Sequence, residues 1–94
     1  MAGYWIVRGG SIKDAEALAT YGTLWGAIAD RFGAKIIAGK GQINCIEGED
    51  FPRVLIVEFP TYDDALKCYE DEEYKQAMSY AHKAYDRELI IAEG

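Results

Sequence analysis

Hydrophobic residues follow two periodicities along the chain, one typical of strands and the other typical of helices. Short apolar runs rich in β-branched and aromatic residues occupy 4–8, 53–59 and 88–93, and they predict three strands. A fourth run at 34–46 is interrupted by Gly39 and by another glycine two positions later. We therefore expect this segment to be a strand with a bulge or bend at the glycines.

The segments between these strands show helical spacing and recognisable ends. One apolar stripe has members alternately 3 and 4 positions apart: Leu18, Tyr21, Trp25, Ile28 and Phe32. The stripe predicts a helix that begins after Asp14 as the N-cap and ends at Gly33. Thr61 is the predicted N-cap of a helix over 62–70, and Asp71 is expected to cap a further helical segment.

The predicted order of elements is strand–helix–strand followed by strand–helix–strand. Two right-handed halves of this kind, interleaved in one sheet, form a ferredoxin-like βαββαβ fold. This α+β fold has a four-stranded antiparallel sheet with its helices on one face. Because no linker or low-complexity segment divides the 94 residues, we expect one domain spanning 1–94.

Three of the predicted strands are apolar on both faces, although the helices can cover only one face. Within 53–59, Leu55 and Val57 point one way, and Val54 and Ile56 point the other. A sheet face in contact with water normally carries polar residues at alternate positions. We therefore expect the uncovered face to pack against a second copy, which gives a homodimeric α+β barrel with an enclosed space between the sheets.

The balance of charge argues against a nucleic-acid partner. Ten basic residues against 16 acidic residues give a net charge of −6, whereas nucleic-acid binding requires clustered Lys and Arg. A helix that spans a membrane needs about 20 consecutive apolar residues, and no apolar run in the chain approaches that length. The N-terminus also lacks the pattern of a secretory signal peptide. We expect no membrane partner and a cytoplasmic location.

The sequence offers no pattern for a metal or a nucleotide cofactor. Cys45 and Cys68 are the only cysteines, they form no CxxC or Cys/His cluster, and we expect both to behave as buried apolar residues. The glycine-rich patterns that bind phosphates are also missing. We therefore expect neither a metal nor another cofactor.

Glu58 is the acidic residue that ends an otherwise apolar strand, and it shares a face with Val54 and Ile56. Antiparallel pairing of the first and third strands would place it near Tyr4. A carboxylate beside an enclosed apolar space could act as a proton acceptor. At the rim of the barrel it would instead bond to a tyrosine, an arginine or water and orient the dimer. The sequence supports both interpretations.

Other polar side chains are also candidates for a site. His82, the only histidine, could be a general base beside a carboxylate and a cleft, or an exposed helix residue. Arg53 lies at a strand entrance, where it could bind a substrate carboxylate. It could equally pair with an acid of the preceding loop: Glu47, Glu49 or Asp50. Arg8 shares a face with Tyr4 and would point to the opposite mouth of the barrel.

Aromatic residues could line a ligand pocket. Tyr21 and Trp25 lie on the first helix, and Tyr69 and Tyr74 follow the third strand. Aromatic residues at helical spacing are also typical of a core, where their polar atoms need hydrogen-bond partners.

Several blocks of the sequence resemble a small bacterial family that is a domain of unknown function. They are GYWI (3–6), FGAKIIAGKG (32–41), IEGE (46–49), PRVLIVEFPT (52–61), ALKCYEDEEY (65–74) and LIIAEG (89–94). The family belongs to the dimeric α+β-barrel superfamily and is distantly similar to antibiotic-biosynthesis monooxygenases, muconolactone isomerases and YciI-like proteins. The resemblance implies a ferredoxin-like protomer whose sheets pair in a dimer. Six residues match positions typical of the family: Tyr4, Tyr21, Arg53, Glu58, Tyr69 and Tyr74.

Three functions are compatible with these features. We favour a homodimer that binds a small apolar or aromatic molecule in a pocket beside the sheet. One alternative is a cofactor-independent enzyme with monooxygenase-like or isomerase-like proton transfer, in which Glu58 and His82 would be the bases. Another is a structural or regulatory interaction module without a ligand.

Overall fold

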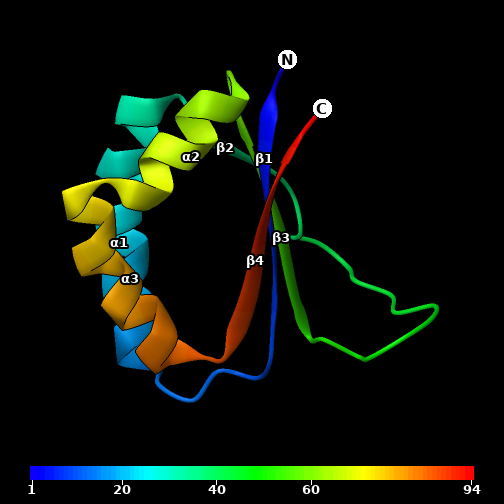
Figure 1. Cartoon of the computed structure of the whole chain (residues 1–94). Helices are drawn as coiled ribbons and strands as arrows, with labels where there is room; N and C mark the ends of the chain where they lie inside the picture. Colours follow the sequence, from blue (N-terminus) through cyan, green and yellow to red (C-terminus); the bar gives the residue numbers. More distant parts are fainter.

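Four antiparallel strands form one sheet, and all three helices lie on one of its faces (Figure 1). The computed structural model describes residues 1–94. Its elements are β1 (Gly3–Gly9), α1 (Ala15–Phe32), β2 (Lys35–Ala38), β3 (Arg53–Phe59), α2 (Tyr62–Glu70), α3 (Glu72–Ala84) and β4 (Arg87–Glu93). The strands lie in the order β2-β3-β1-β4. The predicted ferredoxin-like βαββαβ fold is confirmed.

The first two helices begin and end at the residues that the sequence predicts. The Asp14 carboxylate accepts a hydrogen bond from the N–H of Ala17 at 3.0 Å, and α1 ends at Gly33 in the left-handed conformation. Thr61 Oγ1 accepts a hydrogen bond from the N–H of Asp64 at 3.0 Å. Each cap satisfies a backbone donor that the first helical turn leaves free. None of the three helices combines the length and the apolar character needed to cross a bilayer.

Trp5 lies at the centre of the core on β1, with 1% of its surface exposed. Its ring packs against four other aromatic rings, with centroid distances of 5.4 Å to Trp25, 5.0 Å to Phe59, 5.9 Å to Tyr69 and 5.0 Å to Tyr74. Trp5 Nε1 donates a hydrogen bond to the carbonyl oxygen of Ala65 at 2.9 Å, so its polar atom is satisfied. These contacts join the sheet to all three helices.

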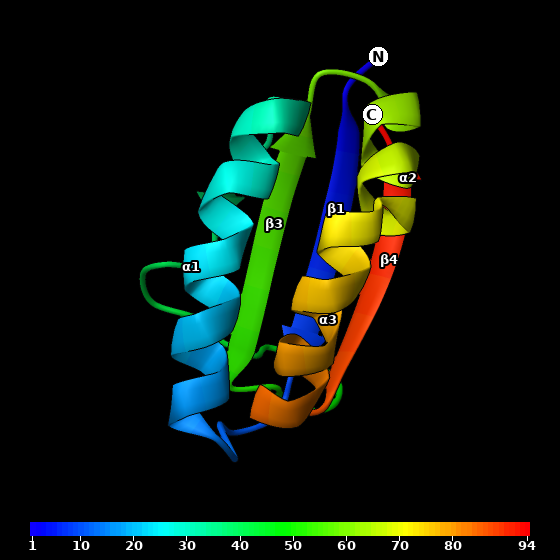
Figure 2. The ribbon, with the colours of Figure 1, turned by 90° about the vertical axis from the view of Figure 1, so that its left-hand side faces the viewer.

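The helices divide the covered face of the sheet between them. Figure 2 shows α1 over the side of the sheet that contains β3, and α2 and α3 over β1 and β4. The opposite face carries no helix (Figure 1). Apolar side chains point to this uncovered face, among them Ile6 and Ile90, which are 37% and 59% exposed. The two apolar faces expected from the sequence are therefore present.

The second strand is shorter than the sequence predicts. It ends at Ala38 instead of continuing to residue 46. Its pairing with β3 shifts register between Ile36 and Ala38, just before Gly39, the first of the two glycines at which a bulge or bend was expected. Residues 39–52 leave the sheet and project on its uncovered side (Figure 1). This segment exposes Cys45, so the expectation that both cysteines are buried is wrong for Cys45 and holds for Cys68.

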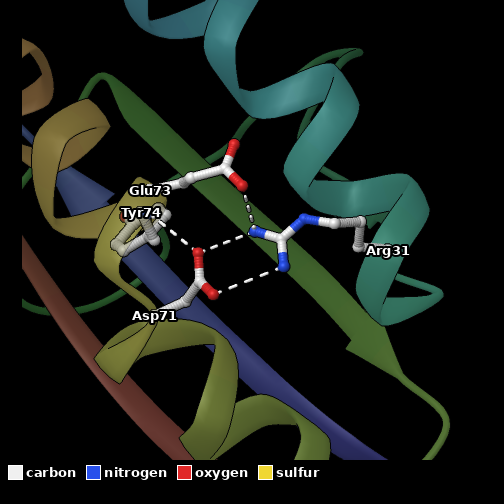
Figure 3. Close-up of polar contacts among 4 residues, drawn as sticks. All are labelled: Arg31, Asp71, Glu73 and Tyr74. Atoms are coloured by element: carbon white, nitrogen blue, oxygen red, sulfur yellow. Dashed lines mark hydrogen bonds and ion pairs between the residues drawn. The ribbon is translucent and has the colours of Figure 1, made fainter.

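A hydrogen-bonded ion pair connects the end of α1 to the junction between α2 and α3 (Figure 3). Arg31 Nη2 lies 2.7 Å from Asp71 Oδ2, and its Nη1 lies 3.3 Å from Oδ1. The second acid in contact with Arg31 is Glu73, at 3.4 Å. Asp71 Oδ2 also accepts a hydrogen bond from the N–H of Tyr74 at 3.2 Å, so Asp71 caps α3 as predicted. The bonds from Arg31 are the main cause that lowers the pKa of Asp71.

Two substitutions of Asp71 separate the ion pair from the helix cap. Asp71→Asn keeps a capping oxygen and removes the charge, whereas Asp71→Ala also removes the cap, at a cost of about 0.5–2 kcal/mol. Because the carboxyl pKa is lowered by folding, the ion pair stabilises the protein above the ordinary value of 3.8 and is lost as the pH falls through the folded-state value. Urea unfolding of parent and Asp71→Asn should therefore differ at neutral pH and converge in acid. An equal difference at both pH values would contradict a role for the charge.

Candidate functional site

A largely apolar pocket of about 220 Å³ lies between α1 and the covered face of the sheet. The helix contributes Leu18, Tyr21, Gly22 and Trp25, and the sheet contributes Trp5, Val7, Ile36, Leu55 and Val57. At one end the wall is completed by Tyr85 and by two arginines, Arg53 and Arg87. An apolar cavity with a few convergent polar groups is the usual form of a small-molecule site.

The two arginines lie on either side of Gly9 in one row across the sheet. Arg53 on β3 and Arg87 on β4 are both register partners of Gly9 on β1. Directly opposed residues point to the same face, so both side chains start on the face that the helices cover. A Cβ atom on residue 9 would lie 2.5 Å from ring carbons of Tyr85, so only glycine leaves room for this ring between the arginines.

Two buried phenols hold Arg87 in place. Its Nη2 donates a hydrogen bond to the Tyr74 hydroxyl at 2.8 Å, and this hydroxyl is 3.0 Å from that of Tyr21. Burial is the main cause that raises the pKa of Tyr21, and the neighbouring Tyr74 raises it further. Burial also raises the pKa of Tyr74, although Arg87 lowers it in part. Both phenols are therefore neutral and supply no counter-charge.

Arg53 contacts an aromatic ring and forms no ion pair. Its Cζ lies 4.9 Å from the centroid of the Tyr85 ring, and its Nε is buried without a hydrogen-bond partner. The expected alternative of an ion pair with an acid of the preceding loop is wrong. None of these acids forms an ion pair with Arg53, and the segment 39–52 that carries them projects on the uncovered side of the sheet (Figure 1).

Glu58 and Tyr4 meet on the other face of the sheet. They are register partners, as antiparallel pairing predicted, and the Tyr4 hydroxyl donates a hydrogen bond to Glu58 Oε2 at 3.2 Å. Lys35 Nζ is 4.0 Å from the other carboxylate oxygen. This hydrogen bond, followed by burial and the negative charge of Glu58, raises the pKa of Tyr4. The sheet itself separates Glu58 from the pocket.

The other predicted candidates lie in three different surroundings. Arg8 is on the uncovered face, where it bonds to Glu88 at 2.7 Å. Tyr69 packs against the core and donates a hydrogen bond to Met78 Sδ at 3.6 Å. His82 is exposed on α3, and partial desolvation followed by the charge of Arg87 lowers its pKa. Of the predicted ligand-binding residues, Tyr21 and Arg53 line the pocket. Tyr74 does not line it but forms a hydrogen bond with Tyr21.

Sequence reasoning overlooked Arg87 and Tyr85. The signal for Arg87 was its spacing of two and four from Leu89 and Ile91, which places it on their face if the strand begins one residue earlier than predicted. Tyr85 is the C-cap of α3 and continues its apolar stripe four positions after Ala81, a spacing that predicts a core residue and gives no signal for a site. No group of three or more His, Cys, Asp or Glu side chains is placed to hold a metal ion.

Removal of the Glu58 charge should lower the pKa of Tyr4 toward its ordinary value of 10.0, because the phenol would no longer donate a hydrogen bond to a negatively charged acceptor. The change Glu58→Gln keeps an acceptor oxygen and can be followed by a ¹³C-tyrosine NMR titration. Glu88→Gln, which removes a charge from the same face beside Arg8, is the control. An equal shift of Tyr4 in both variants would contradict the direct hydrogen bond.

Comparisons with known proteins agree with this fold. A family model described as "Domain of unknown function (DUF1330)" matches residues 2–94. The RPA0582 protein of unknown function from Rhodopseudomonas palustris has a similar structure, with 21% identity over 99% of this chain and 82% of its own, and a TM-score of 0.76. None of the curated proteins compared with the chain matches it.

Two other solved structures are similar at lower identity. A dimeric protein of unknown function and ferredoxin-like fold from Bacteroides fragilis shares 19% identity over 99% of this chain and 96% of its own, with a TM-score of 0.55. SnoaB, a cofactor-independent oxygenase from Streptomyces nogalater, shares 9% identity over 99% of this chain and 92% of its own, with a TM-score of 0.60. At these identities the likeness concerns the fold.

Proposed function

The chain belongs to the DUF1330 family, a domain of unknown function, and from its pocket we propose that it binds a small, largely apolar or aromatic molecule beside the sheet. The observation that carries this proposal is the apolar cavity of about 220 Å³ between α1 and the sheet. An apolar cavity of about 150 Å³ is already sufficient to bind benzene. The pocket therefore has room for one or two fused rings with a small substituent.

We further propose that two copies associate through the uncovered face of the sheet. The apolar residues on this face and the projecting segment 39–52 support such an interface. The similar proteins from Bacteroides fragilis and Thermobifida fusca are both described as dimeric. The ligand pocket would remain on the outer, helix-covered side of each sheet.

Binding is supported better than catalysis. The enzymatic alternative requires bases at Glu58 and His82, and these residues lie on the uncovered face and on the exposed side of α3. A general base must come within hydrogen-bond reach of the proton it abstracts. Neither residue lines the pocket. An interaction module without ligand is the remaining alternative, and it predicts no binding in the pocket.

A pocket-filling substitution tests the binding proposal. Gly22 on α1 lines the pocket, and a Cβ atom there would meet no other atom within 4 Å. Gly22→Leu should abolish binding of 2-naphthamide, a neutral probe, while stabilising α1 by about 0.5–1 kcal/mol through loss of a helical glycine. Trp5 and Trp25 are the two tryptophans of the chain, and both line the pocket. Binding is measured as the quenching of their fluorescence by the probe.

The matched control is Gly26→Leu. Gly26 lies one turn further along α1, also in open space, and does not line the pocket. It should gain the same helix stability and keep the affinity of the parent for 2-naphthamide. Absence of any binding by the parent protein, or equal loss in both variants, would contradict the proposal.

A charge on the uncovered face tests the dimer. Ile6→Lys should convert a dimer to a monomer, because an ammonium group cannot be buried between two apolar sheets without large cost. Leu66→Lys on α2 is the control, since Leu66 and Ile6 are both 37% exposed. Sedimentation velocity at micromolar concentration distinguishes the two states. A parent protein that sediments as a folded monomer would overturn the assembly.

A further inference from the structure

We propose that the pocket is specific for carboxylates, so that its ligand is an apolar or aromatic molecule with one carboxylate group held by Arg53 and Arg87. This inference rests on the proposed binding function and adds the chemical class of the ligand. Its basis is the unusual position of two positive charges in an acidic protein.

The four arginines of the chain fall into two pairs with opposite surroundings. Arg8 and Arg31 lie at the surface, and each contacts a carboxylate at 2.7 Å. Arg53 and Arg87 line the pocket, and neither forms an ion pair, although the chain carries 16 acidic residues. The arginines that most need a counter-charge are therefore those that lack one.

The walls of the pocket offer the arginines rings and hydroxyl groups but no negative charge. No acidic residue lines the cavity. Arg53 and Arg87 lie 4.9 Å and 5.6 Å from the centroids of the Tyr85 and Tyr21 rings, which offset part of the cost of desolvation. The Tyr74 hydroxyl occupies one N–H of Arg87, and the buried Nε of Arg53 has no partner. Donors therefore remain free on both guanidinium groups.

The arrangement fits a ligand with one anionic end. Both arginines are register partners of Gly9, so they lie on either side of β1 at the same end of the sheet. The apolar residues Trp25 and Val57 line the remainder of the cavity. A guanidinium group matches a carboxylate in geometry and forms charge-assisted hydrogen bonds with it. The carboxylate would lie at the arginine end and the apolar body between α1 and the sheet.

A pair of probes with the same shape tests this inference. 2-Naphthoate carries a carboxylate, and 2-naphthamide carries a neutral amide on the same ring system. Because a hydrogen bond to a charged group contributes more than a neutral one, the parent should bind naphthoate at least about tenfold more tightly than naphthamide. Isothermal titration calorimetry gives both dissociation constants.

Variants then assign the preference to the arginines. In Arg53→Gln and Arg87→Gln, the ratio of the two affinities should fall several-fold toward one. Because both probes have the same shape and are compared on the same variant, a general change in the affinity of the pocket cancels in this ratio. Arg53→Lys keeps the charge and should retain part of the preference. Lys75→Gln removes one positive charge from an exposed position outside the pocket and should retain the full ratio.

The outcomes separate this inference from the proposed function. Equal affinity of the parent for both probes, or an unchanged ratio in both arginine variants, would overturn carboxylate specificity and leave the binding function standing. Failure of both probes to bind the parent would overturn both proposals. A ratio that falls equally in Lys75→Gln would assign the preference to the overall charge of the protein and would also overturn the role of the arginines.

Discussion

The packing of Trp5 is the interaction on which the rest of the structure depends. Its indole lies on β1, one of the two inner strands, and contacts aromatic rings from α1, β3, α2 and α3. Its N–H reaches the carbonyl oxygen of Ala65 in α2, so a large apolar ring is buried with no unsatisfied polar atom. This packing fixes which face of the sheet the helices cover. The faces of the other side chains on β1, β3 and β4 follow from that choice, because successive residues of a strand point to opposite faces.

The alternation places the charges of the strands in two different environments. On the covered face, the row that contains Gly9 carries an arginine on each neighbouring strand, and the pocket begins there. On the uncovered face, Glu58 meets Tyr4 and Lys35 in a polar group beside water. The same sheet therefore separates a positively charged, largely apolar cavity from a surface where charges are paired. Binding and assembly use opposite faces in our proposals.

The family and the similar structures establish the fold of this protein but do not identify a ligand or a reaction. The ferredoxin-like sheet supports proteins of unknown function and a cofactor-independent oxygenase alike, so function depends on the side chains that each chain places around the sheet. In this chain the pocket residues are aromatic, aliphatic and cationic, with no acid among them. That composition supports recognition of a ligand more directly than proton transfer.

The sequence by itself determined the helices, their caps at Asp14, Thr61 and Asp71, and the meeting of Tyr4 with Glu58. These features depend on residues close in the chain or on the antiparallel pairing of two strands, and the hydrophobic periodicity of the sequence predicts the helices and strands involved. It did not determine where β2 ends. The partner strand β3 continues to Arg53, beyond the Ile56 that pairs with Ala38, but the chain leaves the sheet at Gly39, whose φ of 108° lies outside the strand region.

Only the tertiary structure decided that Arg53 and Arg87 line the same pocket and that Arg53 forms no ion pair with the loop acids. These two arginines are far apart in the chain and lie on either side of Gly9 because β3 and β4 both pair with β1. Alternation along one strand shows which face a side chain is on. Which residues of β3 and β4 lie opposite Gly9 depends on the register of the assembled sheet, which the burial of its apolar face specifies.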